Sequence, residues 1–187
     1  VIKTPLPPGT LTIFYDSDER YVQEYLTKYP DFYNTGDAAY IDGDGYVFIM
    51  GRSDDIINTL GHRLSTVAME EIRMHHSAVA DCVVIPGKDI VKGEVPVGFV
   101  FTKKGSTIDV EQLQAELVQS VRESLGAVAS FKLVGVVKAL PKTRSGKVLR
   151  STMAKIANGQ PYTITPTIED PNIFEQLEPE IQKLVGR

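Results

Sequence analysis

A short charged stretch, Met50–Arg63, constrains this chain most, because it separates two different sequence patterns. It holds two arginines, two adjacent aspartates and two glycines around a small apolar step. The residues before it are typical of β structure, and those after it are typical of a separate α/β unit. Paired opposite charges between glycines suit a polar ligand beside a flexible joint better than a core. We interpret the stretch as a hinge with nucleotide-binding side chains.

Composition describes an ordinary globular protein of 187 residues, with 42% hydrophobic and 24% charged residues. The net charge of −4 argues against nucleic acid or an anionic membrane as the main partner. One cysteine, Cys82, cannot form an internal disulfide, which fits a reducing compartment. No apolar run is long enough to span a bilayer. Val1 is not a start residue, which indicates a fragment of a longer protein.

Hydrophobic periodicity and turn residues predict most elements of the chain. In the helix expected after Ser65, Ala68 and Ile72 share the apolar face, whereas Glu70, Glu71 and Arg73 are assigned to the wet side. The expected helices cover residues 18–29, 65–75, 109–125 and 149–156, with a last one from Asp170; the expected strands cover 33–41, 46–50, 81–86, 95–101 and 131–140.

This order predicts an α+β fold in two parts. Residues 1–53 form a β-rich part with a hairpin around the turn Asp42-Gly43-Asp44-Gly45. Residues 54–187 form a small domain, a roughly three-stranded sheet flanked by helices, with a helical tail. The turn is not a calcium loop, because the twelfth position, which requires glutamate, is Ser53.

Three motifs carry candidate chemistry. In Thr35-Gly36-Asp37, the aspartate can accept two hydrogen bonds from vicinal hydroxyls while the glycine lets a ligand approach. In the charged stretch, Arg52 and Arg63 can bind hydroxyls or phosphate. In Pro141–Lys147, a lysine in a polar loop can enter another domain's site and neutralise developing negative charge. Alone, each motif has a structural alternative: a turn aspartate, a surface ion-pair cluster and a solvated basic loop.

In this order and spacing, the three motifs resemble the C-terminal part of acyl-CoA synthetases, which belong to the adenylate-forming (AMP-binding) superfamily. The resemblance covers essentially the whole chain and is strongest for the short-chain branch, the acetyl- and propionyl-CoA synthetases. The stretch Pro161–Pro171 is most similar to propionate-type members.

The resemblance implies an enzyme with two half-reactions. ATP and a carboxylic acid give an acyl-adenylate and pyrophosphate, and the CoA sulfur then displaces AMP. Between them the small C-terminal domain swings about a hinge. Residues 1–53 would be the remnant of a large N-terminal domain, whose phosphate loop and acyl pocket precede Val1. We therefore expect this chain alone to form no acyl-adenylate.

Site residues follow from the resemblance by position. Asp54 matches the hinge, Asp37 and Arg52 match ribose-binding residues, and Arg63 matches an arginine that reaches the nucleotide phosphate. Lys147 matches the lysine required for adenylation, where it lies between the carboxylate and the α-phosphate.

The resemblance also implies a CoA-binding face. Leu60 and Gly61 match the face that lines the pantetheine channel, although the family has serine or alanine where this chain has Leu60. Arg122 matches a residue that contacts CoA phosphate. A Mg²⁺ site, formed largely by main-chain oxygens, would lie at Met74, His76 and Val79.

Cofactors and partners complete the expectation. ATP/AMP, coenzyme A and Mg²⁺ would be held mostly with the large N-terminal domain, and lysine acylation and deacylation enzymes would act on Lys147. The compartment would be the cytoplasm or the mitochondrial matrix. Two alternatives stay open: another adenylate-forming enzyme (a luciferase, an aryl- or medium-chain CoA ligase, or a peptide-synthetase adenylation domain), or a stand-alone binding module without catalysis.

Overall fold

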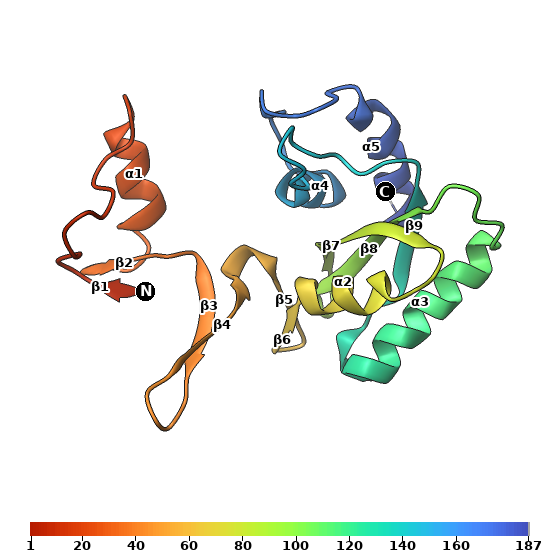
Figure 1. Cartoon of the computed structure of the whole chain (residues 1–187), viewed down its shortest axis with the longest axis horizontal. Coiled ribbons are helices and arrows are strands. Elements are labelled where there is room, and N and C mark those ends of the chain that lie inside the picture. The colour runs from red at the N-terminus through yellow and green to blue at the C-terminus, as the bar shows by residue number, and fades with distance from the viewer. Residues whose placement is uncertain (187) are drawn as a thin grey trace. The chain divides into compact units, whose positions relative to one another are not determined.

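The computed structural model describes residues 1–186, apart from the side chains of Met50 and Asp54. The chain divides into two units, Val1–Asp54 and Asp55–Arg187. Figure 1 follows their elements from the red N-terminus to the blue C-terminus. None of the helices in the described part has the length and hydrophobicity needed to cross a membrane.

The first unit contains one helix and two pairs of short strands. Helix α1 (Asp18–Tyr25) ends before residue 29, the expected end, because Thr27 donates both its N–H and its hydroxyl to the carbonyl of Val22. This turn closes the helix ahead of Pro30. The strands pair as β1 with β2 and as β3 with β4; their bounds are Ile2–Lys3 (β1), Phe32–Tyr33 (β2), Asp37–Ile41 (β3) and Val47–Arg52 (β4).

The β3–β4 hairpin has the aspartate turn that the sequence predicts. Asp42 Oδ1 accepts the N–H of Asp44 at 3.0 Å and that of Tyr46 at 2.9 Å, which is how aspartate stabilises a turn. The strands are antiparallel, with a register shift between Ala38 and Ala39. This register sets which residues meet at the other end of the hairpin.

The second unit contains a five-stranded sheet. It is larger than the three strands expected, because residues on either side of Leu60 and Gly61 form a hairpin that joins the sheet at Thr59 and Gly93. Strand β9 runs parallel to β8, and the other pairs are antiparallel. The strands are β5 (Ile56–Thr59), β6 (His62–Ser65), β7 (Val79–Asp89), β8 (Gly93–Thr102) and β9 (Leu133–Val137).

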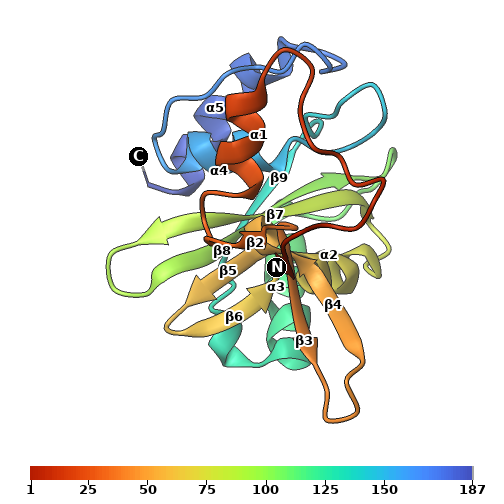
Figure 2. The same cartoon turned by 90° about the vertical axis from the view of Figure 1, so that its left-hand side faces the viewer.

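Helices cover both faces of this sheet (Figures 1 and 2). In β7, Val83 and Ile85 belong to the apolar cluster with α4 and α5, whereas Cys82 and Val84 belong to the cluster with α2 and α3. Successive side chains in a strand point to opposite faces, so a strand covered on both faces is apolar throughout. The helices are α2 (Thr66–Met74), α3 (Val110–Leu125), α4 (Arg150–Ala157) and α5 (Ile173–Leu184).

Helix caps explain where the helices begin. Ser65 caps α2 by accepting the Ala68 N–H, and Asp109 caps α3 by accepting two N–H groups of its first turn. Helix α5 begins at Ile173, later than expected, because Asp170 accepts the N–H of Asn172 at 2.9 Å and forms a separate turn.

One sequence assignment in α2 is wrong. Arg73 was expected on the wet side but is fully buried, with its guanidinium 5.1 Å from the ring centre of Phe131. Glu70 also turns inward and accepts the Val84 N–H at 2.7 Å. The reason is tertiary, because α2 packs against both β7 and α3, and only Val67, Glu71 and Met74 of this helix stay exposed.

Candidate functional site

Asp37 and Arg52 lie opposite each other at the open end of the β3–β4 hairpin, because the strand register pairs them. Arg52 Nη1 lies 3.3 Å from Asp37 Oδ1 and donates to the Thr35 carbonyl at 3.0 Å. The Arg52 side chain is 55% exposed, and the Asp37 side chain is 35% exposed. The pair thus offers a carboxylate acceptor and guanidinium donors, which suits a ligand with hydroxyl groups.

Gly36 is what allows this close arrangement. It has a φ of +73°, and a Cβ at this position would lie 2.5 Å from Arg52 Nη2. Its carbonyl accepts the Ser53 N–H at 2.7 Å, which joins the two ends of the hairpin. Any side chain at position 36 would displace the guanidinium.

The joint between the units is the short 3₁₀ helix Ser53–Asp55. The side chain of Asp54, the expected hinge, lies outside the described residues. Directly after the joint the backbone is fixed: Ile57 is fully buried, and the buried Thr59 hydroxyl donates to the Glu94 carbonyl at 2.7 Å. The rigid part of the second unit therefore begins within two residues of Asp55.

Leu60 and Gly61 form the two-residue tip of the β5–β6 hairpin. Both have positive φ, +51° and +83°, as the hairpin turn that matches strand twist requires. Leu60 is 58% exposed, and a Cβ on Gly61 would meet open space. Arg63 follows on β6, opposite Asn58, and is also exposed. The tip and Arg63 thus form one exposed edge of the second unit.

Lys147 is exposed near the tip of a closed loop. The loop begins and ends with a β-bridge between Lys142 and Val148. Within it, Thr143 donates its N–H to the Lys147 carbonyl at 2.8 Å and accepts the Gly146 N–H on its own carbonyl at 2.8 Å. The Thr143 hydroxyl also accepts the Lys147 N–H at 3.1 Å. These hydrogen bonds connect the two arms of the loop, and Lys147 is exposed.

Arg150, which sequence reasoning missed, connects this loop to the joint. Its Nη1 lies 2.6 Å from Asp55 Oδ1, and its Nη2 lies 2.8 Å from both oxygens of Glu70. Burial alone would lower the pKa of Arg150, but the two carboxylates outweigh that effect and raise it. The partners are 95 and 80 positions away in sequence, so no local spacing could indicate them.

A basic pocket of about 320 Å³ lies at the C-terminal end of α3. Lys92, Arg122 and Lys132 line it, and none of its described lining residues is acidic. Lys92 Nζ donates to Ser130 Oγ at 3.3 Å, which fixes one of the three cations. Three converging positive charges suit a phosphate-bearing ligand. Only Arg122 of these residues was a sequence-predicted site residue.

The residues expected at a Mg²⁺ site lie where α2 connects to β7: Met74 ends α2, His76 lies in the turn, and Val79 begins β7. The His76 carbonyl accepts the Val79 N–H at 3.1 Å, and His76 Nε2 lies 2.8 Å from Glu116 Oε2. This hydrogen bond lowers the pKa of the Glu116 carboxyl. Within the described residues there is no group of three or more His, Cys, Asp or Glu side chains that could hold a metal ion. Main-chain oxygens would have to supply most of the ligands.

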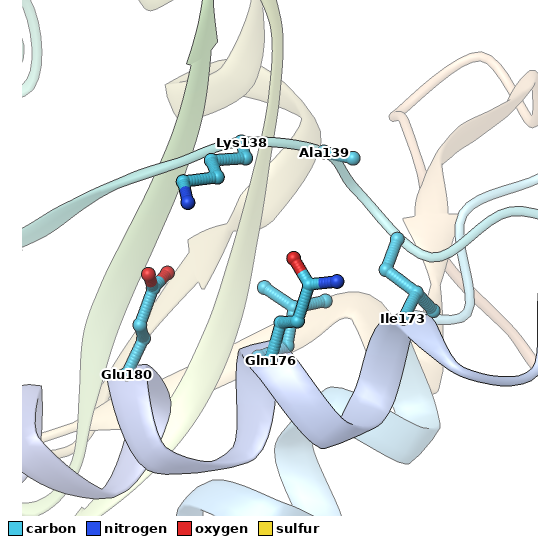
Figure 3. A pocket seen from close by; sticks show the side chains of 6 residues that line it. Lys138, Ala139, Ile173, Gln176 and Glu180 are labelled. Carbon is cyan, nitrogen blue, oxygen red and sulfur yellow. The ribbon is translucent and has the colours of Figure 1, made fainter.

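A further pocket of about 330 Å³ lies between α5 and the segment after β9. Figure 3 shows Lys138 and Glu180 facing each other across it, with Gln176 beside them. Opposite charges that face each other neutralise one another, so this pocket lacks the excess positive charge of the basic pocket.

Comparison with known proteins identifies the domain. Residues 68–147 match the model of the AMP-binding enzyme C-terminal domain. Residues 68–147 of the chain therefore form an AMP-binding enzyme C-terminal domain. The resemblance predicted from the three motifs is thus confirmed at the level of the family.

The characterised relatives of this chain include short-chain acyl-CoA synthetases. Mitochondrial acyl-CoA synthetase short-chain family member 3 of Mus musculus is 45% identical over 185 residues, 99% of this chain and 27% of that protein. An uncharacterised Pseudomonas aeruginosa protein is 53% identical over 178 residues, 95% of this chain and 28% of that protein. The chain therefore spans about a quarter of the length of these relatives.

Solved structures support the fold. The acetoacetyl-CoA synthetase from Streptomyces lividans superposes with a TM-score of 0.73 at 24% identity, covering 89% of this chain and 25% of that one. The match shows that this chain shares its arrangement of helices and strands with part of that protein. The predicted mixed α and β architecture is confirmed.

Proposed function

We propose that this chain is the C-terminal part of an ATP-dependent acid–CoA ligase that activates a short-chain carboxylic acid, acetate or propionate. The observation that carries the proposal is Lys147, which is exposed in a loop whose backbone is closed by its own hydrogen bonds. A cation held in this way can enter a second domain's site without reorganising the loop. The match to the AMP-binding enzyme C-terminal domain, which includes Lys147, and the similarity to a short-chain acyl-CoA synthetase support this role.

The residues divide between the two half-reactions. In the first, a carboxylate oxygen bonds to the α-phosphorus of ATP, and pyrophosphate leaves. Asp37 and Arg52 bind the ribose, Arg63 binds the nucleotide phosphate, and Lys147 neutralises charge between the carboxylate and the α-phosphate. The exposure of all four side chains supports these roles.

In the second half-reaction, the CoA thiolate bonds to the acyl carbon and AMP leaves. The domain turns about Asp54, so that the Leu60–Gly61 tip replaces Lys147 at the active site. Arg122 binds a CoA phosphate, and Lys92 and Lys132 in the same pocket add positive charge to support it. The open space around Gly61 supports close approach of the pantetheine chain.

Main-chain oxygens of Met74, His76 and Val79, where α2 connects to β7, would hold Mg²⁺. Met74 ends α2, and the last carbonyls of a helix lack intrahelical partners and carry partial negative charge. A cation there would neutralise that charge. The large domain, which residues 1–53 would complete, holds the phosphate loop, the acyl pocket and the Mg²⁺ that accompanies ATP.

Regulation and location extend the same proposal. Lysine acylation enzymes can reach Lys147 because it is exposed, and acylation removes the charge that adenylation needs. The mitochondrial location of a relative supports the mitochondrial matrix, and the cytoplasm is the alternative compartment.

The test is a comparison of half-reactions in the full-length enzyme. Lys147→Ala should abolish ATP–pyrophosphate exchange and spare thioester formation from supplied acyl-adenylate. Lys155→Ala, which removes another exposed lysine close to the loop, is the matched control and should change neither rate. Equal loss of both half-reactions in Lys147→Ala would contradict the assigned role. The 187-residue chain alone should show no exchange, and any detectable exchange would refute that part of the proposal.

Substrate choice needs the full-length protein as well. Rates with acetate and propionate, measured side by side, identify the acid. Failure of both acids, with activity on an aromatic or medium-chain acid, would assign the enzyme to another branch. No adenylation of any acid by an intact full-length protein would favour the stand-alone binding module.

A further inference from the structure

The segment after the matched domain has no role assigned by the family model. The match to the family ends at Lys147, whereas the chain continues with helix α4, an extended segment and helix α5. We define the tail strap as residues 165–169. It lies directly against the lysine loop.

Backbone pairing joins the tail strap to the loop. Arg144 donates its N–H to the Thr167 carbonyl at 2.9 Å, and Glu169 donates its N–H to the Lys142 carbonyl at 2.9 Å. A β-bridge between Thr143 and Ile168 lies between these two bonds. The loop arm that begins at Lys142 is therefore paired on both sides, with the strap on one and with Val148 on the other.

The tail strap is itself held by the core. Ile168 is only 5% exposed and belongs to the apolar cluster that includes Leu140 and Met153. The Tyr162 hydroxyl, just before the strap, donates to Glu178 of α5 at 2.9 Å. Helix α5 packs onto the same cluster through Phe174, Leu177 and Ile181. The segment just before the strap is thus hydrogen-bonded to α5, and the strap itself is anchored in the core through Ile168.

This arrangement fixes the loop without contacting the lysine side chain. A polar loop that contains a glycine would otherwise sample many conformations. It would then lose conformational entropy each time the lysine enters an active site. Pairing with an anchored strap removes that freedom in advance. The contacts involve residues 142–144, so Lys147 keeps its exposure while its backbone stays in place.

We propose that the tail strap positions the Lys147 loop for the adenylation half-reaction. Ile168 is a positioning residue, because it acts through the loop and touches no reacting group. The inference rests on the proposed function for its catalytic consequence, but the effect on the loop itself does not. A purely structural tail would stabilise the whole domain and leave the loop no more ordered than the rest.

The first experiment measures hydrogen exchange in this chain. Ile168→Ala should speed amide exchange at Thr143, Gly146 and Lys147 by at least about tenfold through local opening. Ile181→Ala removes the same atoms from the same apolar cluster but within α5, and should leave these amides at the protection of the wild type once global stability is accounted for. Ile168→Val keeps the branched side chain and should restore protection.

Two results would overturn the proposal. One is equal protection of the three loop amides in Ile168→Ala and the wild type. The other is equal loss of protection in Ile168→Ala and Ile181→Ala, which would mean that the tail acts only on the domain as a whole.

The second experiment tests catalysis in the full-length ligase. Ile168→Ala should lower kcat for ATP–pyrophosphate exchange by about tenfold with little change in KM, and should keep thioester formation from acyl-adenylate within about twofold. Ile181→Ala should change neither rate per folded molecule. If Ile168→Ala leaves the rate of ATP–pyrophosphate exchange unchanged, the positioning role fails. If the wild type itself adenylates nothing, the proposed function fails, and the hydrogen-exchange result still decides whether the strap orders the loop.

Discussion

The two units of the chain are held together in different ways. Among the buried hydrophobic residues of the described chain, only Tyr21 lies in the first unit, and the rest form two clusters on the faces of the second unit's sheet. The first unit relies on strand pairing and on exposed aromatic contacts, such as the Tyr40–Phe48 stack with ring centres 5.0 Å apart. Asp37 and Arg52 are therefore held by local contacts, whereas the lysine loop is held by a core.

This difference fits the proposed division of the enzyme. The β3–β4 hairpin exposes a run of apolar side chains, and a contiguous apolar surface of this kind marks an interaction site. We propose that the rest of the large domain covers it. The second unit needs no such cover, since both faces of its sheet are already packed. The exposed residues of the hairpin are Tyr40, Ile41, Tyr46, Val47, Phe48 and Ile49.

The largest expected contrast is between two phenylalanines. Phe99 is fully buried on β8, and Phe99→Ala should destabilise the second unit by about 3–5 kcal/mol because it leaves a cavity. Phe48 is 45% exposed, and Phe48→Ala should lower stability by about 1 kcal/mol or less, the value of an aromatic pair. Chemical denaturation of each variant measures both values. Equal losses would mean that the first unit has a core of its own.

The next contrast is between two arginines. Arg150→Ala leaves the mostly buried carboxylates of Asp55 and Glu70 without their partner and should cost about 3–5 kcal/mol. Arg52→Ala breaks a more exposed pair and should cost about 1 kcal/mol or less. Denaturation midpoints report both.

The Arg150 effect has a rescue control. Arg150→Lys keeps the charge but loses the fork geometry that reaches Glu70 with one nitrogen and Asp55 with the other, so it should restore only part of the loss. A loss below about 1 kcal/mol in Arg150→Ala would contradict a network that joins the lysine loop to the joint.

The sequence predicted the features that depend on interactions between residues close together in the chain. The apolar spacing of residues 109–125 predicted α3 within one residue, because a helix with one buried face is specified by its own sequence. The hairpin turn at Asp42 followed from the hydrogen bonds of aspartate to its own backbone. The three motifs were readable for the same reason, since each lies within a few consecutive residues.

Contacts between residues far apart in the sequence could not be predicted in this way. The Arg150 network joins residues 80 and 95 positions apart, and the strap pairs with the loop across an entire helix. The hairpin at Leu60 was missed because leucine rarely adopts a positive φ, and only pairing with β8 gives β5 its place in the sheet. Arg73 was misplaced because its burial depends on packing with α3 and on Phe131, far along the chain.

Arg73 gives the last and smallest test. Its guanidinium is fully buried, and none of its three nitrogens meets a hydrogen-bond partner in good geometry among the described residues, although Cys82 and Glu70 lie close enough to offset part of the effect of burial on its pKa. Burial lowers its pKa, and the Phe131 ring offsets only part of the loss of hydration. Arg73→Leu should therefore raise the free energy of unfolding by about 1–4 kcal/mol. Arg73→Lys keeps a buried charge without the planar stacking and should be less stable than the wild type. If Arg73→Leu is destabilising in thermal denaturation, the arginine contributes through contacts that outweigh its burial, and the second unit is held by more than its apolar clusters.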